Sequence, residues 1–286
     1  MTAGMGTKAV SVVTSDGAAI PALGFGTYGM SGQLLVDLVR EAANSGFRHV
    51  DTAQVYGNEA AVGEGIRQSR VGRDAVFVTT KVWVSNYGSR TFAASVDESL
   101  GRLGIDHVDL LLLHWPSPTV PLADQIGGLN AAVNAGKARY IGVSNFPIAM
   151  MEEAVRLSQH KLLTNQFEYH PYLGQRRLVA ATRQQGLAVT AYCGMAVGRV
   201  LQETLLQDMA LRYHRSVAQI VLRWLVQQEK VIALSRTTNV ARLAGNVAIF
   251  DFRLDDADME MISALATPGS RIVDPPGIAP QWDPTD

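Results

Sequence analysis

Four side chains that can exchange protons lie at the ends of three short apolar segments. They are Asp51, Tyr56, Lys81 and His114. The segments cover residues 49–51, 76–80 and 108–113, and if they form parallel strands of one sheet, their carboxyl ends meet at one edge. An acid, a phenol, an amine and an imidazole can each set the protonation state of a neighbour. The pattern therefore predicts a proton-transfer site.

Composition and charge argue against several classes of partner. The chain has 286 residues, 47% of them hydrophobic and 18% charged, and a formal net charge of −1. No basic field is available for nucleic acid or an anionic membrane. Cys193 is the only cysteine, and no Cys/His cluster has the spacing of a metal site. Residues 1–8 lack a signal-peptide core, and no apolar run could span a bilayer, so we expect a cytoplasmic monomer.

From Leu23 onwards, short apolar strands alternate with helices of 3.6-residue periodicity. The expected strands begin near Leu23 and then cover residues 49–51, 75–80, 108–113, 139–143, 163–169, 188–192 and 231–234. The expected helices cover residues 34–43, 58–66, 92–103, 122–135, 149–157, 178–185, 203–228 (as one or two helices), 240–247 and 256–265. Eight strand–helix units without a change of composition predict an α/β fold, a (β/α)8 TIM barrel that forms one domain over residues 1–286.

Local patterns make three further predictions about these elements. Asp16-Gly17 between residues 10–14 and 18–21 predicts an N-terminal β-hairpin that plugs or flanks the main body. Asn58 is expected to cap the second helix. The first helix is expected to place one continuous apolar face against the barrel, made of Leu34, Leu35, Leu38, Val39, Ala42 and Ala43.

The C-terminal tail, residues 267–286, holds five of the eleven prolines and can be neither helix nor central strand. Ile272, Val273, Ile278 and Trp282 give it apolar anchors. We therefore favour an ordered lid over the mouth of the site. Disorder of the last few residues is the alternative.

A glycine motif offers a competing interpretation of the N-terminal region. Residues 24–29 match G-x-G-x-x-G, and Asp51 follows at the distance expected of a dinucleotide-binding open sheet. In that fingerprint, however, the last glycine opens the helix directly, whereas Met30-Ser31-Gly32 intervene here. The strand–helix units also continue uniformly to Asn246. We therefore favour the barrel.

Five motifs, in this order along the chain, carry a resemblance to a known family. They are Asp51-Thr52-Ala53-x-x-Tyr56-x-Asn58-Glu59, Thr80-Lys81-x-Trp83, His114-Trp115-Pro116, Gly142-Val143-Ser144-Asn145-Phe146 and Asn165-Gln166-x-Glu168-Tyr169. Together they resemble the aldo-keto reductases over essentially the whole chain. The tail from Arg271 to Asp283 further resembles the bacterial 2,5-diketo-D-gluconate reductases of the B type.

The resemblance implies a catalytic tetrad at the carboxyl face of the barrel. In it, Tyr56 is the general acid, Lys81 lowers the pKa of Tyr56, Asp51 pairs with Lys81, and His114 orients the carbonyl. An ammonium group about 4 Å from a phenol, at an effective dielectric constant of about 20, is worth about 4 kcal/mol, or about three pKa units. We therefore expect the pKa of Tyr56 to lie near the working pH, with Asp51 keeping Lys81 charged.

The same resemblance implies a nicotinamide cofactor. Ser144, Asn145 and Gln166 would contact its carboxamide, and Tyr192 would stack beneath the ring. Gly26 and Thr27 are also predicted to contact the cofactor. At the adenosine end, the predicted residues are Arg236, Thr237, Arg242 and Asn246. Two guanidinium groups and a hydroxyl suit a phosphate, which argues for NADPH over NADH, although Arg236 replaces the usual lysine and Gly245 a glutamate that contacts adenine.

Four aromatic residues are predicted to wall the substrate pocket, namely Tyr28, Trp83, Trp115 and Trp282. The implied activity is reduction of an aldehyde or ketone, with 2,5-diketo-D-gluconate and small dicarbonyls such as methylglyoxal as candidate substrates. A non-catalytic barrel that binds the cofactor and regulates another protein is the alternative, and an intact tetrad counts against it. A metal-assisted hydrolase or aldolase would need a ligand cluster that the sequence lacks.

Overall fold

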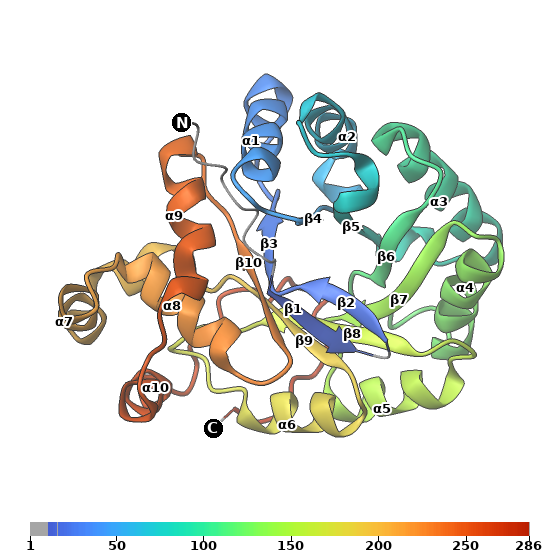
Figure 1. The fold of residues 1–286 in the computed structure, drawn as a ribbon. Coiled ribbons are helices and arrows are strands. Elements are labelled where there is room, and N and C mark those ends of the chain that lie inside the picture. The colour runs from blue at the N-terminus through green and yellow to red at the C-terminus, as the bar shows by residue number, and fades with distance from the viewer. Residues whose placement is uncertain (1–10, 16, 286) are drawn as a thin grey trace.

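Eight parallel strands close into a barrel with helices around its outside (Figure 1). The structure, a computed structural model, describes residues 11–15 and 17–285. Each strand pairs with its neighbours in chain order, and the last one closes the ring on the first. The barrel strands are β3 (Leu23–Gly26), β4 (His49–Asp51), β5 (Phe77–Val82), β6 (Val108–Leu113), β7 (Ala138–Ser144), β8 (Leu162–Glu168), β9 (Ala188–Tyr192) and β10 (Val231–Ser235). The predicted (β/α)8 barrel is confirmed, and the open-sheet alternative is wrong.

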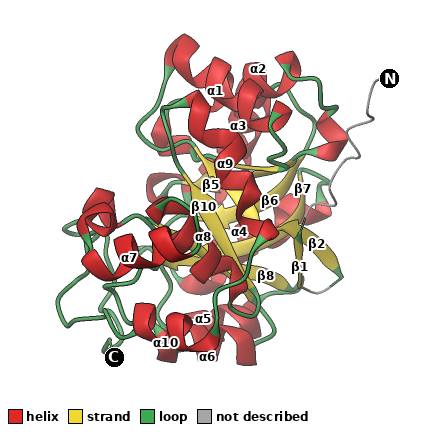
Figure 2. Cartoon of the chain, turned by 60° about the vertical axis from the view of Figure 1, so that its left-hand side comes forward, coloured by secondary structure: helices red, strands yellow, loops and turns green. Residues whose placement is uncertain are grey.

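Helices cover the outer face of the strands (Figure 2). They are α1 (Gly32–Asn44), α2 (Glu59–Gln68), α3 (Ser89–Leu103), α4 (Leu122–Asn134), α5 (Ile148–Leu157), α6 (Arg176–Gln184), α7 (Thr204–Arg212), α8 (Val217–Gln227), α9 (Leu243–Val247) and α10 (Asp256–Ser263). Short 3-10 segments are η1 (Gln54–Tyr56), η2 (Arg73–Ala75), η3 (Val84–Asn86), η4 (Ala196–Gln202), η5 (Val240–Arg242) and η6 (Ala248–Asp251). Over the described residues, none of the helices combines the length and the apolar character needed to cross a membrane.

The boundaries differ from the predicted ones at two places that matter. The segment 203–228 forms two helices, because Ser216 and Gln219 make a reciprocal capping box that begins α8. The third barrel strand runs from residue 77 to residue 82 rather than from 75 to 80. Lys81 therefore lies within the strand, where the barrel holds its backbone.

The apolar face of α1 is rotated from the predicted one. Leu35, Leu38 and Val39 are buried as expected, but Leu34 is 53% exposed and Val36 is buried instead. Successive helix residues turn by about 100°, which places Leu34 about 120° from the middle of the buried stripe. The prediction for Leu34 is therefore wrong, because its position in the first turn faces away from the barrel.

The hairpin of β1 (Val12–Ser15) and β2 (Ala18–Pro21) lies across one opening of the barrel (Figure 1). Ile20 packs with Leu110, Leu112 and other interior residues, and the Ser15 hydroxyl donates to the Leu163 carbonyl at 3.0 Å. The predicted hairpin is confirmed, and it closes the barrel floor. Val10 and Asp16, which belong to the predicted hairpin, and residues 1–8 lie outside the described residues.

The barrel interior above this floor is tightly filled. A Cβ atom at Gly24 would lie 2.7 Å from the Leu234 side chain and 2.8 Å from His49 Nδ1. Only glycine leaves room here for the His49 ring, which is 1% exposed. The interior is thus a packed core, and the open end lies at the carboxyl ends of the strands.

Candidate active site

A buried ion pair forms the centre of the open end. Lys81 on β5 is fully buried, and its Nζ lies 2.5 Å from Oδ1 of Asp51, the last residue of β4. The same ammonium group donates to the Thr52 carbonyl at 2.9 Å. The other carboxylate oxygen of Asp51 accepts a hydrogen bond from Gln166 Nε2 at 2.9 Å. Adjacent parallel strands therefore orient both charges.

Tyr56 and His114 lie beside this pair. Tyr56 ends the short segment η1, and Lys81 Nζ is 5.2 Å from the centre of its ring. The His114 ring packs edge to face against Tyr56, with ring centres 5.6 Å apart. The four residues thus converge, although they come from two strands, a 3-10 segment and the loop after β6. His114 Nδ1 is buried and has no hydrogen-bond partner among the described residues, which leaves Nε2 to face the mouth.

The pKa of Tyr56 corrects one prediction. Burial of the hydroxyl end of this half-buried side chain raises the pKa of Tyr56 above its ordinary value, and Lys81 opposes that shift by its charge and by hydrogen bonding without reversing it. We expected a net decrease because we weighed the ammonium group alone. The loss of water around the phenol outweighs it.

The neighbours of Tyr56 keep definite charge states. Burial lowers the pKa of Lys81, but Asp51 and Tyr56 more than compensate, so the pKa of Lys81 lies above its ordinary value and the amine is charged. Burial, helped by the charge of Lys81, holds the pKa of His114 well below its ordinary value. The site therefore presents a neutral phenol, an ammonium group and a neutral imidazole at neutral pH.

Aromatic side chains surround the phenol and the imidazole. Tyr28, 68% exposed, lies 5.1 Å from the Tyr56 ring, and Trp83 lies 5.2 Å from the His114 ring, both measured between ring centres. Trp115 is buried, and its ring packs edge to face against Trp282, with ring centres 6.0 Å apart. The structure thus places all four predicted wall residues around one mouth, with Trp115 as a buried support.

Gln54, which is not among the predicted site residues, positions the loop that carries Trp83. Its Oε1 accepts from the Trp83 and Asn86 nitrogens, both at 2.9 Å. Its Nε2 donates to the Ser95 carbonyl at 3.0 Å, which ties the loop to α3. An uncharged glutamine between two motif residues gave no local signal.

The predicted carboxamide contacts form a hydrogen-bonded group at the ends of β7, β8 and β9. The Ser144 hydroxyl donates to the Gln166 carbonyl at 2.8 Å, and Asn145 Nδ2 donates to the His114 carbonyl at 3.0 Å. The half-buried Tyr192 donates its hydroxyl to Asn145 Oδ1 at 2.7 Å. Gln166 Oε1 accepts no hydrogen bond from the described part of the chain, so it is free to accept from a ligand amide. This acceptor fits the amide group of a nicotinamide.

The predicted phosphate contacts lie at the end of β10. Arg236 is exposed and donates through Nε to the Tyr28 carbonyl at 2.6 Å. A Cβ atom at Gly29 would lie 3.3 Å from Arg236 Nη2, so the missing side chain keeps a cradle open beside this guanidinium. Arg242 is exposed as well, whereas Thr237, which follows Arg236 in the chain, is buried. This donor set fits a phosphate group.

Three other predicted residues support the framework. The Asn246 amide donates to the Ser235 hydroxyl at 2.9 Å. Thr27, which follows Gly26, donates its hydroxyl to the Asp51 carbonyl at 3.0 Å. Asn58 is the N-cap residue of α2, as predicted, but its side chain makes no capping hydrogen bond. Its Nδ2 instead donates to the Thr27 and Met30 carbonyls, both at 2.9 Å, and so ties the loop after β3 to the start of α2.

The tail covers one side of the mouth as an ordered segment. Both oxygens of Glu168, at the end of β8, accept from the tail backbone: Oε1 from Ile272 N at 2.8 Å and Oε2 from Val273 N at 2.9 Å. Asp283 accepts from the Ile148 nitrogen at 2.8 Å. The described part of the tail is therefore tied to the barrel by hydrogen bonds, and its action as a lid stays a prediction. No local pattern in the sequence marks Glu168 as its anchor.

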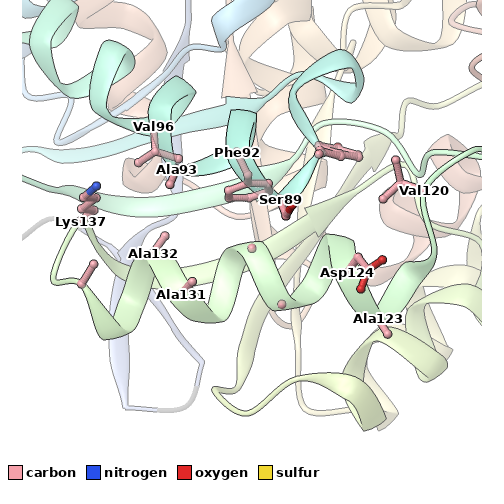
Figure 3. Close-up of a pocket in the computed structure, with 15 residues that line it drawn as sticks. Ser89, Phe92, Ala93, Val96, Val120, Ala123, Asp124, Ala131, Ala132 and Lys137 are labelled. Atoms are coloured by element: carbon pink, nitrogen blue, oxygen red, sulfur yellow. The ribbon is translucent and has the colours of Figure 1, made fainter.

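A second hollow lies outside the barrel mouth. A groove of about 420 Å³ runs between α3 and α4 on the outside of the barrel (Figure 3). Small side chains line much of it, including Ala93, Ala123 and Ala131, and the ammonium group of Lys137 at one end is paired with Asp97 at 2.5 Å. It holds no convergent set of titratable groups, so we place the chemistry at the barrel mouth.

Comparisons with known proteins agree with this geometry. Residues 22–267 match the model of the Aldo/keto reductase family. The chain is 39% identical over 267 residues to methylglyoxal reductase DkgB of Yersinia pestis, covering 92% of this chain and 99% of that protein. A crystal structure provisionally described as a 2,5-diketo-D-gluconic acid reductase B has 54% sequence identity and a TM-score of 0.95, covering 96% of this chain and 98% of that one. An aldo-keto reductase of Bombyx mori in complex with NADP has 33% identity and a TM-score of 0.82, covering 90% and 92%.

Proposed function

The chain belongs to the aldo/keto reductase family and is therefore an oxidoreductase, and from this premise we propose that it reduces aldehydes and ketones to alcohols with NADPH. The contact between Lys81 and Asp51 beside the Tyr56 ring carries the proposal. In this arrangement Tyr56 is a proton donor whose conjugate base, the phenolate, is stabilised by the charge of Lys81.

Tyr56 would act as the general acid. The carbonyl oxygen gains negative charge as its carbon is reduced, and the neutral phenol can give it a proton. Lys81 then stabilises the phenolate that remains, and Asp51 keeps the amine charged despite its burial. A neutral His114 can donate one hydrogen bond from Nε2 to the same carbonyl oxygen, which orients the carbonyl and polarises it.

The cofactor would be held by groups on both sides of the mouth. Gln166, with Ser144 and Asn145, would bind the carboxamide, and the Tyr192 ring would support the nicotinamide. Arg236 and Arg242 would bind the phosphate that distinguishes NADPH from NADH. When bound, NADPH supplies the hydride that adds to the carbonyl carbon.

The substrate would enter between Tyr28, Trp83 and Trp282. These side chains form an apolar wall that excludes water from the reacting carbonyl. Relatives named for methylglyoxal and for 2,5-diketo-D-gluconic acid make small dicarbonyls and keto-sugar acids the first compounds to assay.

A panel of carbonyl compounds, with NADPH and NADH in parallel, tests the proposal by the loss of nicotinamide absorbance. We expect turnover that requires both a carbonyl compound and a cofactor, with a higher kcat/KM for NADPH. Binding of NADPH without turnover of any compound on the panel would favour a regulatory barrel instead.

Replacing the phenol tests the assigned acid. Tyr56→Phe should lower kcat by about 10²- to 10⁴-fold, because the general acid is lost, while NADPH binding measured by fluorescence changes less than about twofold. Tyr140→Phe is a matched control, since Tyr140 packs near the hairpin at the barrel floor. Normal turnover by the Tyr56 variant would show that another group donates the proton.

A further inference from the structure

Arg271, in the tail, has an unused hydrogen-bonding capacity at the edge of the mouth. Within the described residues, its guanidinium group donates no hydrogen bond and has no carboxylate oxygen within ion-pair distance. Its Nη1 atom is buried and unpartnered. A guanidinium offers five N–H donors, and leaving a buried one without an acceptor costs free energy. Such a group in a ligand-binding mouth is suited to an anion.

The backbone that follows Arg271 is fixed. The two residues that follow it, Ile272 and Val273, donate to the buried carboxylate of Glu168 at 2.8 and 2.9 Å. Glu168 ends β8, the strand that also carries Gln166, the partner of Asp51. Arg271 is therefore held at a constant place relative to the catalytic ion pair.

The side chain is also oriented. The guanidinium carbon lies 3.7 Å from the centre of the Trp282 ring, and that ring contacts Trp115, the residue next to His114. Stacking on an aromatic face leaves the in-plane N–H groups free for a second partner. The guanidinium thus belongs to the wall of the substrate mouth.

Its neighbours do not fill those in-plane positions. Asp274 Oδ1 accepts from Trp282 Nε1 at 2.8 Å, Asp283 Oδ2 accepts from the Ile148 nitrogen, and both oxygens of Glu168 accept from the tail. These carboxylates offset the charge of Arg271 from a distance. Among the described residues no bidentate partner is present, so these positions are open to a ligand.

Tyr192 links the guanidinium to the reaction centre. Burial raises the pKa of Tyr192, Arg271 opposes that shift, and Tyr56 adds to it. The Tyr192 hydroxyl also donates to Asn145, whose amide donates to the carbonyl of His114, and the Trp282 ring on which Arg271 stacks contacts Trp115, the residue after His114. Arg271 and the reaction centre therefore share the same wall of the mouth.

We propose that Arg271 recognises a carboxylate on the substrate, so that the preferred carbonyl compounds are oxo acids rather than neutral aldehydes or ketones. This inference rests on the proposed reductase function. Arg271 is then a specificity-determining residue, which binds the substrate in its ground state and transition state alike. Its loss should raise KM more than it lowers kcat.

Matched pairs of substrates test the assignment with the full chain and NADPH. We would compare aliphatic ω-oxo acids of four to six carbons with their methyl esters, and measure the ratio of kcat/KM for acid over ester. The ratio should exceed one for the wild-type protein with at least one chain length. Arg271→Gln should lower that ratio at least about tenfold, because a charge-assisted, bidentate contact is lost.

Two further variants keep the result interpretable. Arg271→Lys retains the positive charge but cannot make two parallel hydrogen bonds, so its acid-to-ester ratio should lie between those of the wild type and Arg271→Gln. Arg253→Gln removes an exposed arginine, with the side chain 71% accessible, and should keep the wild-type ratio. Because the readout is a ratio, a general loss of activity from a loosened tail does not imitate the expected result.

The outcomes separate the two hypotheses. If the wild-type protein turns over acids and esters but Arg271→Gln and Arg271→Lys leave the ratio unchanged, the carboxylate assignment is wrong and the reductase function stands. If the wild-type protein turns over neither compound of any pair, nor any member of the carbonyl panel, the proposed function itself fails.

Discussion

The phenol of Tyr56 is a better donor for one direction of the reaction than for the other. Burial keeps its pKa above the ordinary value, so nearly every molecule carries the proton at neutral pH. Reduction of a carbonyl needs that proton, whereas oxidation of an alcohol needs the phenolate. The environment of this one residue therefore favours reduction.

This environment predicts the pH dependence of both directions. The kcat of carbonyl reduction should stay within about twofold between about pH 6 and pH 9, because Tyr56 remains protonated and His114, whose pKa is well below its ordinary value, remains neutral. Alcohol oxidation should instead rise with pH over the same range, as the phenolate fraction increases. Steady-state kinetics in buffers of constant ionic strength measure both profiles. A sharp fall in the reduction rate between pH 7 and 9 would contradict the raised pKa.

The sequence predicted that these four residues converge because each lies at, or a few residues from, the carboxyl end of a strand. Strand ends follow from local apolar patterns, and a parallel barrel brings them to one face. The pKa of Tyr56 could not be predicted in this way, since its sign depends on a balance between lost water and a neighbouring charge. That balance is fixed only when Lys81 and Asp51 are placed in three dimensions.

At the scale of elements, the tail is the part that local patterns describe least. Its prolines indicate an irregular segment, and its apolar residues indicate packing. Its anchor, however, is Glu168, more than a hundred positions away in the sequence. The same is true of Asn58, whose role depends on carbonyl groups of the loop after β3. Side chains that serve distant backbone groups leave no periodic signal.

The Glu168 anchor predicts how the tail can be released. In Glu168→Gln, one oxygen becomes an NH₂ group that faces a backbone N–H, so at least one charge-assisted hydrogen bond worth about 1.5–3 kcal/mol is lost. Hydrogen exchange of the amides in residues 268–285 should then become about tenfold faster or more, while the barrel strands keep their protection. KM for carbonyl substrates should rise as the Trp282 wall loosens.

A matched control separates this anchor from general loss of charge. Glu260→Gln removes a carboxylate whose side chain is 77% exposed, on the helix that precedes the tail. It should leave tail exchange at the wild-type rate. Equal protection of the tail in both variants would mean that its apolar contacts hold it without Glu168.

At the scale of the whole molecule, the two ends of the barrel differ in function: one carries the polar site, and the other is packed and closed. The carboxyl end gathers charged and polar groups around the mouth, whereas the floor is closed by the hairpin and packed around His49. This ring lies against Phe77, and its Nε2 atom is 3.0 Å from the Thr79 hydroxyl. A titratable group in such a place contributes to global stability rather than to chemistry.

His49 makes the stability of the barrel depend on pH in a definite direction. Burial lowers the pKa of His49 from an ordinary 6.5 to about 4. The unfolded chain therefore binds a proton at a higher pH than the folded one, so stability is complete above the unfolded pKa and is lost as the pH falls towards the folded pKa. The shift corresponds to a loss of about 3 kcal/mol in the free energy of unfolding.

Urea unfolding at pH 7.5 and pH 4.5 tests this prediction. The free energy of unfolding of the wild-type protein should show most of this loss between the two pH values, and in His49→Gln the loss should be smaller by about 2–3 kcal/mol. His160→Gln, which removes a histidine near the surface, should behave as the wild type does. An equal loss of unfolding free energy in His49→Gln and the wild type would mean that groups other than His49 destabilise the barrel at low pH.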